Sequence, residues 1–123
     1  MLIFRLFVAL LCLPIFGCTP KELPTVYQIT PEIVMIKLSH ETDKNTISMI
    51  KDSLAKLNII MDDSGTNFYD NARIRNLVLT ITTENGNSGR LSADAVNLQF
   101  KYFGFIIDKN SGRFKVGEMM DEK

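Results

Sequence analysis

Apolar residues between positions 33 and 57 follow two different periods. The run at 33–38 (IVMIKL) comes after Pro31 and is rich in β-branched side chains, which is typical of a central strand. Downstream, apolar residues recur at helical spacing, at Ile47, Ile50, Leu54 and Leu57. This spacing predicts an amphipathic helix of about four turns with one buried face. We expect Thr42 or Asp43 to cap its N-terminus and Asn58 to end it, because Asn tolerates the left-handed conformation.

The segment after this helix predicts strands separated by turns. Residues 59–61 open a second strand, and a turn-like break separates it from the aromatic pair at 68–69. Residues 73–83 form a third strand, in which two sets of side chains alternate: Leu77, Leu79 and Ile81 with Val78, Thr80 and Thr82. The alternation predicts that the first set faces the core. Asn, Gly and Ser at 85–89 predict a loop.

The most hydrophobic strand predicted for the domain spans 98–107 (LQFKYFGFII). A helical turn is one interpretation of the preceding residues 92–97. A hairpin turn at 108–112 then leads to a last strand at 113–116. Alternation along the hydrophobic strand gives two faces, one with Phe100 and Tyr102 and one with Phe103, Phe105 and Ile107.

One face of this hydrophobic strand must belong to the core. The other is either covered by the segment around Val26 and Tyr27 or exposed as an interaction patch, since exposed apolar patches of this size usually bind a partner. The edge strand beside it offers a second surface, because an open edge accepts a strand from another chain. An envelope protein could therefore bind through the edge strand or through residues 100–107 (Phe100–Ile107).

The predicted order of elements is β-α-β-β-β-β. This order favours an α+β fold with one amphipathic helix packed on one face of a small, mainly antiparallel sheet of four or five strands. We expect a single α+β domain at 32–117, followed by a flexible charged tail at 118–123.

The N-terminal residues 1–17 have the pattern of a cleaved signal peptide. Arg5 is their only charged residue, and the apolar run that follows it is interrupted by Pro14. A basic start, a short apolar stretch and a small residue at the end are typical of secretion. A membrane-spanning helix needs about 20 apolar residues, so this run is too short for a permanent span.

The end of this segment, Ile15-Phe16-Gly17-Cys18, resembles the lipobox of bacterial lipoproteins. The resemblance implies that Cys18 is the lipidation site and becomes an S-diacylglyceryl cysteine with an N-palmitoyl group. Three acyl chains would hold the protein on a membrane essentially permanently. An Asp directly after the lipidated cysteine would resemble a retention signal for the inner membrane. This chain has Thr19 at that position, which favours an outer membrane. Residues 18–31, which contain Pro20 and Pro24, are predicted to be the lipid-anchored tether.

Composition agrees with this picture and excludes some functions. The chain has 123 residues, with 14 Lys and Arg against 14 Asp and Glu, so nothing favours nucleic acid as a partner. The length suits one domain. Cys12 would leave with the signal peptide and Cys18 would carry lipid, so no disulfide is expected.

No recognisable set of catalytic residues is present, and we expect no enzyme activity, no cofactor and no metal. His40 is the only histidine, which is too few for a zinc site. No G-x-S-x-G elbow and no phosphate-binding glycine motif occurs. The alternative is a small envelope hydrolase or inhibitor-type domain that uses the loop around His40, with Glu41 and Asp43 nearby.

Residues 36–89 resemble a small βαββ module of Bacteroidota lipoproteins. They also resemble the extracytoplasmic tail of antirepressor-type membrane metallopeptidases. The shared features are the strand that ends near Ser39, the Thr42-Asp43 cap, the apolar helix stripe, Asn58 before a β-branched strand, and the loop at 85–89. The peptidase motif H-E-x-x-H is absent, since Thr-Asp-Lys follows His40-Glu41. The resemblance therefore implies a non-catalytic binding or assembly module in the cell envelope, with the domain in the periplasm or at the cell surface.

Overall fold

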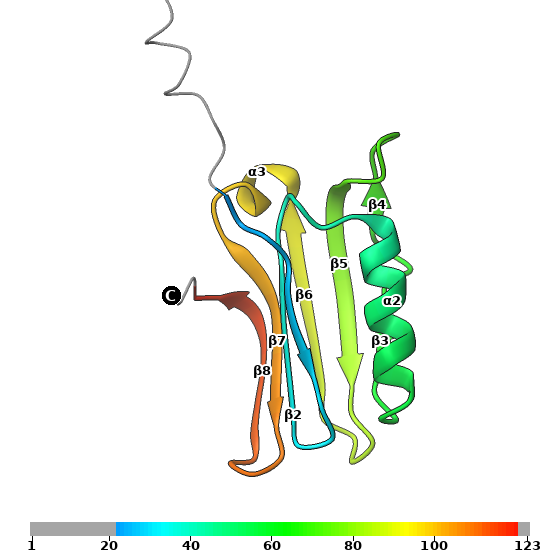
Figure 1. Ribbon diagram of the computed structural model, residues 1–123, viewed down its shortest axis with the longest axis vertical. Helices are drawn as coiled ribbons and strands as arrows, with labels where there is room; N and C mark the ends of the chain where they lie inside the picture. The colour runs from blue at the N-terminus through cyan, green and yellow to red at the C-terminus, as the bar shows by residue number, and fades with distance from the viewer. Residues whose placement is uncertain (1–21, 121–123) are drawn as a thin grey trace, which may run out of the picture.

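The computed structural model describes residues 22–120, and the predicted signal peptide and Cys18 lie outside this range. Within it, the chain forms a small mixed α/β domain dominated by antiparallel sheet, with eight strands and two helices (Figure 1). The elements are β1 (Val26–Ile29), β2 (Ile33–Leu38), α2 (Lys44–Ala55), β3 (Ile60–Asp62), β4 (Asn67–Phe68), β5 (Ile74–Thr82), β6 (Ser88–Asp94), α3 (Ala95–Leu98), β7 (Tyr102–Asp108) and β8 (Arg113–Met119).

The strands form two antiparallel sheets that share one core. The first sheet has the order β1-β2-β7-β8, and in the second β5 pairs with β3, β4 and β6. Both sheets and α2 contribute side chains to one buried cluster, which includes Val34, Ile36, Leu38, Ile47, Ile50, Leu54, Leu77, Leu79, Ile81, Leu91, Phe105 and Ile107. Burial of this apolar surface is the main driving force for folding.

Helix α2 begins as its sequence predicts but ends earlier, at Ala55, so Leu57 of the predicted apolar stripe lies beyond the helix and is half-buried. The amide of Thr46 donates to Oδ1 of Asp43 at 2.8 Å, which makes Asp43 the N-cap. Asn58 follows the helix with a φ of 60°, in the left-handed region. Ile47, Ile50 and Leu54 are fully buried, as the helical spacing predicts.

The burial of side chains in strand β5 also agrees with the alternation that its sequence predicts, and the burial in β7 agrees in part. In β5, Leu77, Leu79 and Ile81 are fully buried while the residues between them are half-buried. In β7, Phe105 and Ile107 lie in the same core. The residue between Phe103 and Phe105 is Gly104, which pairs with Lys37 of β2. A Cβ atom at Gly104 would lie 1.8 Å from the carbonyl oxygen of Ile36, so glycine is required for the close approach of the two strands.

The domain begins earlier than the sequence predicts. Residues 18–31 were expected to form a tether, whereas Leu23 is fully buried and β1 pairs with β2 from Val26 to Ile29. β1 is short and lies between Pro24 and Pro31, so its local sequence is typical of a linker. Its strand conformation comes from pairing with β2, and pairing between distant residues gives no local signal.

The predicted number of four or five strands is too low, because β1 and β6 are additional strands and β4 is separate from β3. β6 takes the place of the end of the predicted loop, and Leu91 and Ala93 are its buried residues. Gly and Ser occupy much of this strand, and both residues are typical of turns. β6 is a strand because it pairs with β5 along its full length.

The predicted strand at 98–107 begins too early. Leu98 ends helix α3, which overlaps the helical turn considered for 92–97, and the strand starts at Tyr102. Tyr102 and Phe100 therefore do not share a strand face: Tyr102 is buried and Phe100 is 58% exposed. At the other end, β8 extends through Met119 and so includes the first residues of the predicted tail.

Leu23 of the N-terminal segment covers one end of the outer face of the first sheet. Leu23, Tyr102 and Met119 form a second buried cluster, with Val26 and Ile106 packed against it. Tyr102 is covered, as one of the two alternatives predicts, but by Leu23 with Val26 beside it, whereas Tyr27 is 51% exposed. Leu23 is thus a packed part of the domain, although Glu22 and Pro24 on either side of it are exposed.

Candidate functional site

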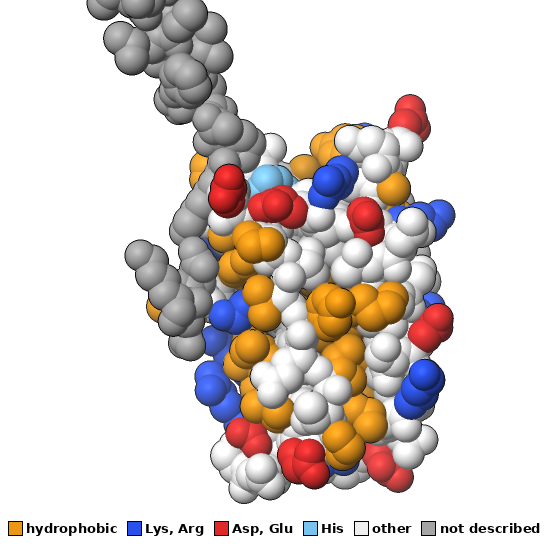
Figure 2. Space-filling view, in the orientation of Figure 1, with side chains coloured by type: hydrophobic (Ala, Val, Ile, Leu, Met, Phe, Trp, Pro, Cys, Tyr) orange, Lys and Arg blue, Asp and Glu red, His pale blue; other side chains and the backbone are white. Residues whose placement is uncertain are grey.

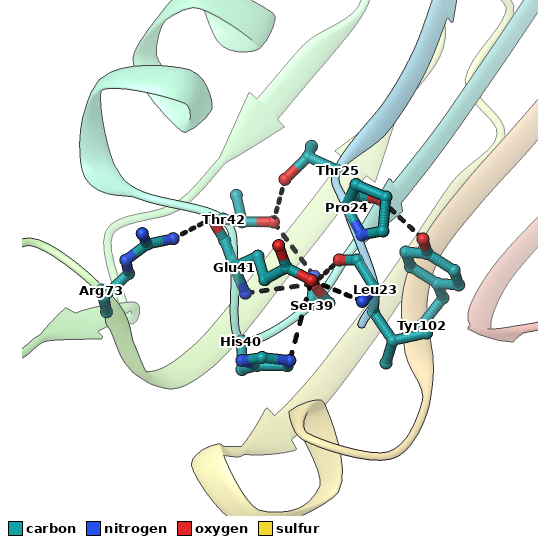
Figure 3. Close-up of polar contacts among 9 residues, drawn as sticks. All are labelled: Leu23, Pro24, Thr25, Ser39, His40, Glu41, Thr42, Arg73 and Tyr102. Atoms are coloured by element: carbon teal, nitrogen blue, oxygen red, sulfur yellow. Dashed lines mark hydrogen bonds and ion pairs between the residues drawn. The ribbon is translucent and has the colours of Figure 1, made fainter. Parts of the chain in front are cut away.

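The N-terminal segment is joined to the loop between β2 and α2 through Leu23 (Figure 3). The amide of Leu23 donates to Oε2 of Glu41, and Oγ of Ser39 donates to the carbonyl of Leu23. Leu23 and Ser39 are both fully buried. Both backbone groups of Leu23 are therefore satisfied by side chains, as buried backbone groups require.

Further hydrogen bonds fix the residues on either side of this contact. The hydroxyls of Thr25 and Thr42 lie 2.7 Å apart, and Thr42 Oγ1 also accepts from the amide of Ser39 at 3.0 Å. The Tyr102 hydroxyl donates to the carbonyl of Pro24 at 2.6 Å. We call the contacts made by residues 23–25 with the loop and with Tyr102 the attachment network (Figure 3). It fixes the position at which the chain from residues 1–22 reaches the domain.

The alternative function, a small hydrolase, would use His40, Glu41 and Asp43. All three residues lie beside the attachment network. Nε2 of His40 is 3.9 Å from Oε2 of Glu41, and the guanidinium of Arg73 donates to the carbonyl of Glu41. The Glu41 carboxylate accepts from Leu23 and the Asp43 carboxylate caps α2. Each of these two carboxylates thus accepts a hydrogen bond from a backbone amide. In the structure, the acids near His40 therefore stabilise the fold.

The pKa of the Asp43 carboxyl is lowered from its ordinary value of 3.8, chiefly because the backbone amide of Thr46 donates to it; the Thr46 hydroxyl and the charge of Arg73 also contribute. A lowered pKa in the folded state means that the ionised carboxylate stabilises the fold above pH 3.8. The stabilisation is lost as the pH falls through the pKa of the folded state.

We expect Asp43→Asn to lower the thermal unfolding midpoint at neutral pH, because an amide accepts the Thr46 hydrogen bond without the charge that strengthens it. The difference from the unmodified chain should shrink in acid, when Asp43 is protonated. Thermal unfolding followed by circular dichroism across this pH range measures both effects. Asp52→Asn, an exposed position in the same helix, is the control that removes a charge without removing the cap. A pH-independent difference for Asp43→Asn would contradict the prediction.

A groove of about 360 Å³ lies at the opposite end of the domain, which we call the distal end. It is bounded by the chain after α2, the β5–β6 loop and the β7–β8 hairpin, which lie together at the bottom of Figure 1. Its apolar lining comes from Leu57, Ile59, Ile107 and Phe114, and its polar rim includes Asn85, Asn87, Asp108, Lys109 and Arg113. An apolar floor with a few polar groups is the usual composition of a binding site.

The two predicted partner surfaces differ in their accessibility. β8 ends its sheet, so the strand predicted at 113–116 is an edge. β7 lies between β2 and β8 and has no open edge. Of its aromatic residues, Tyr102 and Phe105 are buried, so only Phe100, which lies outside the strand, is substantially exposed. The proposed partner surface at 100–107 therefore reduces to Phe100.

Several residues of the two ends were not predicted from the sequence. Ser39, Arg73 and Tyr102 bind partners that are 16, 32 and 78 residues away in the chain, respectively. The distal groove combines three segments that are separate in sequence. Such sites carry no local motif, and the hairpin pattern at 108–112 indicates a turn but not a groove.

Comparison with protein-family models, with curated proteins and with solved structures found no match to this chain. Within residues 22–120, no helix is long and apolar enough to cross a membrane. In the same residues, no group of three or more His, Cys, Asp or Glu side chains is arranged to hold a metal ion. The features of this chain that bear on function are the N-terminal sequence and the two ends of the domain.

Proposed function

We propose that this chain is a bacterial lipoprotein, anchored through Cys18, whose domain is a non-catalytic binding or assembly module of the cell envelope. The observation that carries the proposal is the N-terminal sequence: a short basic and apolar signal ends in Gly17-Cys18. The domain then begins at Leu23, only five residues after Cys18. The signal peptide is removed, and the domain is held at the outer surface of the cytoplasmic membrane or on an outer membrane.

The attachment network supports this assignment. A lipid anchor holds a domain close to the membrane only if the chain between them is short and its far end is fixed to the domain. Here the hydrogen bonds of Leu23 with Ser39 and Glu41 fix that end. In the same proposal, α2 is the single amphipathic helix that covers one face of the sheet, with Ile47, Ile50 and Leu54 as its buried side. The resulting scaffold leaves the distal end available to a partner.

The distal groove is the binding site of the module in this proposal. Its floor is apolar, while its rim carries both acidic and basic residues, such as Asp108 and Arg113. Balanced charge with an apolar floor favours a protein segment that inserts an apolar side chain, because there is no excess charge to select a strongly charged ligand. Asp108 to Gly112 is the hairpin turn beside this groove.

Photocrosslinking in intact cells tests the binding function. A photoreactive amino acid at Lys109, on the groove rim, is expected to give a discrete crosslinked product. The substitution Asn87→Trp, which fills part of the groove, should reduce the amount of this product. The same amino acid at Arg90, which is exposed on β6, is the matched control and should not give this product. Identical crosslinking from both positions, or none from Lys109, would contradict a binding module at the distal end.

A further inference from the structure

Exposed apolar side chains lie next to the point where the N-terminal segment joins the domain. Val96 on α3 is 64% exposed, and Phe100, two residues after the end of α3, is 58% exposed. α3 is held against the β2–α2 loop, since the amide of His40 donates to the carbonyl of Leu98 at 3.0 Å. The same loop binds Leu23, so α3 and the start of the domain share one end of the molecule, at the top of Figure 1. We call this end the tether end.

The chain between Cys18 and Leu23 is shorter than the domain. Five residues span at most about 18 Å when fully extended. Strand β5 has nine residues and runs along the long axis of the molecule (Figure 1), which at about 3.3 Å per residue corresponds to about 30 Å. With the distal end against the bilayer, Leu23 would lie about 30 Å from the surface, beyond the reach of a lipidated Cys18. The anchor therefore excludes the inverted orientation.

The remaining orientations differ in which side chains meet the lipid. Of the exposed apolar residues, Val96 and Phe100 are four positions apart and lie at the tether end, whereas Ile60 projects from β3. Apolar and aromatic side chains at a membrane interface gain free energy by burial in the boundary between headgroups and acyl chains. Both acidic and basic side chains lie at this end on the face shown in Figure 2, so that face has no purely basic patch to attract anionic lipid.

On the basis of the proposed lipid anchor, we propose that the tether end is a membrane-contacting surface, in which Val96 and Phe100 enter the headgroup region of the bilayer that holds Cys18. The lipid anchor confines the domain to the surface, and these two side chains select its orientation. The distal groove then faces away from the bilayer, where a soluble or membrane-bound partner reaches it.

Site-specific fluorescence on the lipidated protein tests this orientation. Because Cys12 is removed and the Cys18 sulfur is acylated, an introduced cysteine is the single free thiol of the mature chain. Val96→Cys, Ile60→Cys and Ser111→Cys are each labelled with an environment-sensitive dye and reconstituted into phosphatidylcholine vesicles that contain a shallow spin-labelled lipid. We expect strong quenching at position 96 and little at position 60 or at position 111, which lies in the distal hairpin. Equal quenching at all three positions, or none at 96, would overturn the proposal.

Two further measurements separate insertion from mere proximity. Adding Phe100→Asp to the labelled Val96→Cys protein should reduce the quenching, whereas adding Ile60→Asp should not; equal effects would refute insertion. Intact-mass analysis of the same samples reports the acyl groups on Cys18. An acylated protein without quenching at 96 overturns the orientation alone, and a protein without acyl groups overturns the anchor together with the orientation.

Discussion

Replacing Cys18 with Ser is expected to abolish incorporation of fatty acid and to release the domain from the membrane fraction. Bacterial lipoprotein modification begins on the cysteine sulfur, and a serine hydroxyl does not replace that nucleophile. A single acyl chain binds a membrane only marginally, and stable anchoring needs a second chain or another membrane-binding element. The change from three acyl chains to none is therefore expected to remove essentially all of the membrane affinity. Metabolic labelling with a radioactive or clickable palmitate, followed by membrane fractionation, measures both outcomes.

Cys12→Ser is the matched control for this experiment. It removes a thiol from the same N-terminal region, but Cys12 lies inside the predicted signal peptide and not at its end. Labelling and membrane association should therefore remain at the level of the unmodified chain. If Cys18→Ser retained the label, or if the native product carried an unmodified thiol at position 18, the proposed anchor would be wrong.

Gly104→Ala is expected to prevent folding of the domain. An added Cβ would lie 1.8 Å from the carbonyl oxygen of Ile36 and 2.7 Å from its carbonyl carbon, so β2 and β7 could not keep their pairing. These two strands are the centre of the first sheet, and they contribute Ile36 and Phe105 to the core. A domain of this size has a free energy of unfolding of about 5–15 kcal/mol, and separation of its central strands removes enough core contact to exceed it. Circular dichroism and the recovery of soluble protein measure the loss.

Gly112→Ala gives a control with a different physical basis. Gly112 lies in the β7–β8 turn with a φ of 72°, and no atom lies within 4 Å of the position of an added Cβ. The cost there is conformational only, about 1–2 kcal/mol for a residue in the left-handed region. We expect a folded protein with a lower unfolding midpoint. A Gly104→Ala protein with an unfolding midpoint at or above that of Gly112→Ala would contradict the steric argument.

Features that depend on neighbours in the sequence could be predicted, and features that depend on distant pairing could not. The Asp43 cap, the Asn58 terminator and the buried stripe of α2 are encoded within one helix. The alternation in β5 is likewise local. β1 and β6 are short or rich in Gly and Ser, and they become strands because β2 and β5 offer them partners.

The candidate site shows the same division. In the sequence, His40, Glu41 and Asp43 are candidate catalytic residues because acids next to a histidine are typical of hydrolytic sites. In the structure, the two carboxylates instead accept backbone amides. The partner of Glu41 is Leu23, 18 residues earlier, in a segment whose prolines indicate a linker. A contact of this kind becomes visible only when the fold brings the loop and the N-terminal segment together.

The attachment network also determines how the protein would resist mechanical load. A pull on the N-terminus reaches Leu23 and then β1, which runs antiparallel to β2 away from the tether end (Figure 1). If a partner holds the distal groove, the load acts along the strands. The hydrogen bonds between β1 and β2 would then be sheared together and not peeled apart one by one, so β1 would resist being pulled out of the sheet.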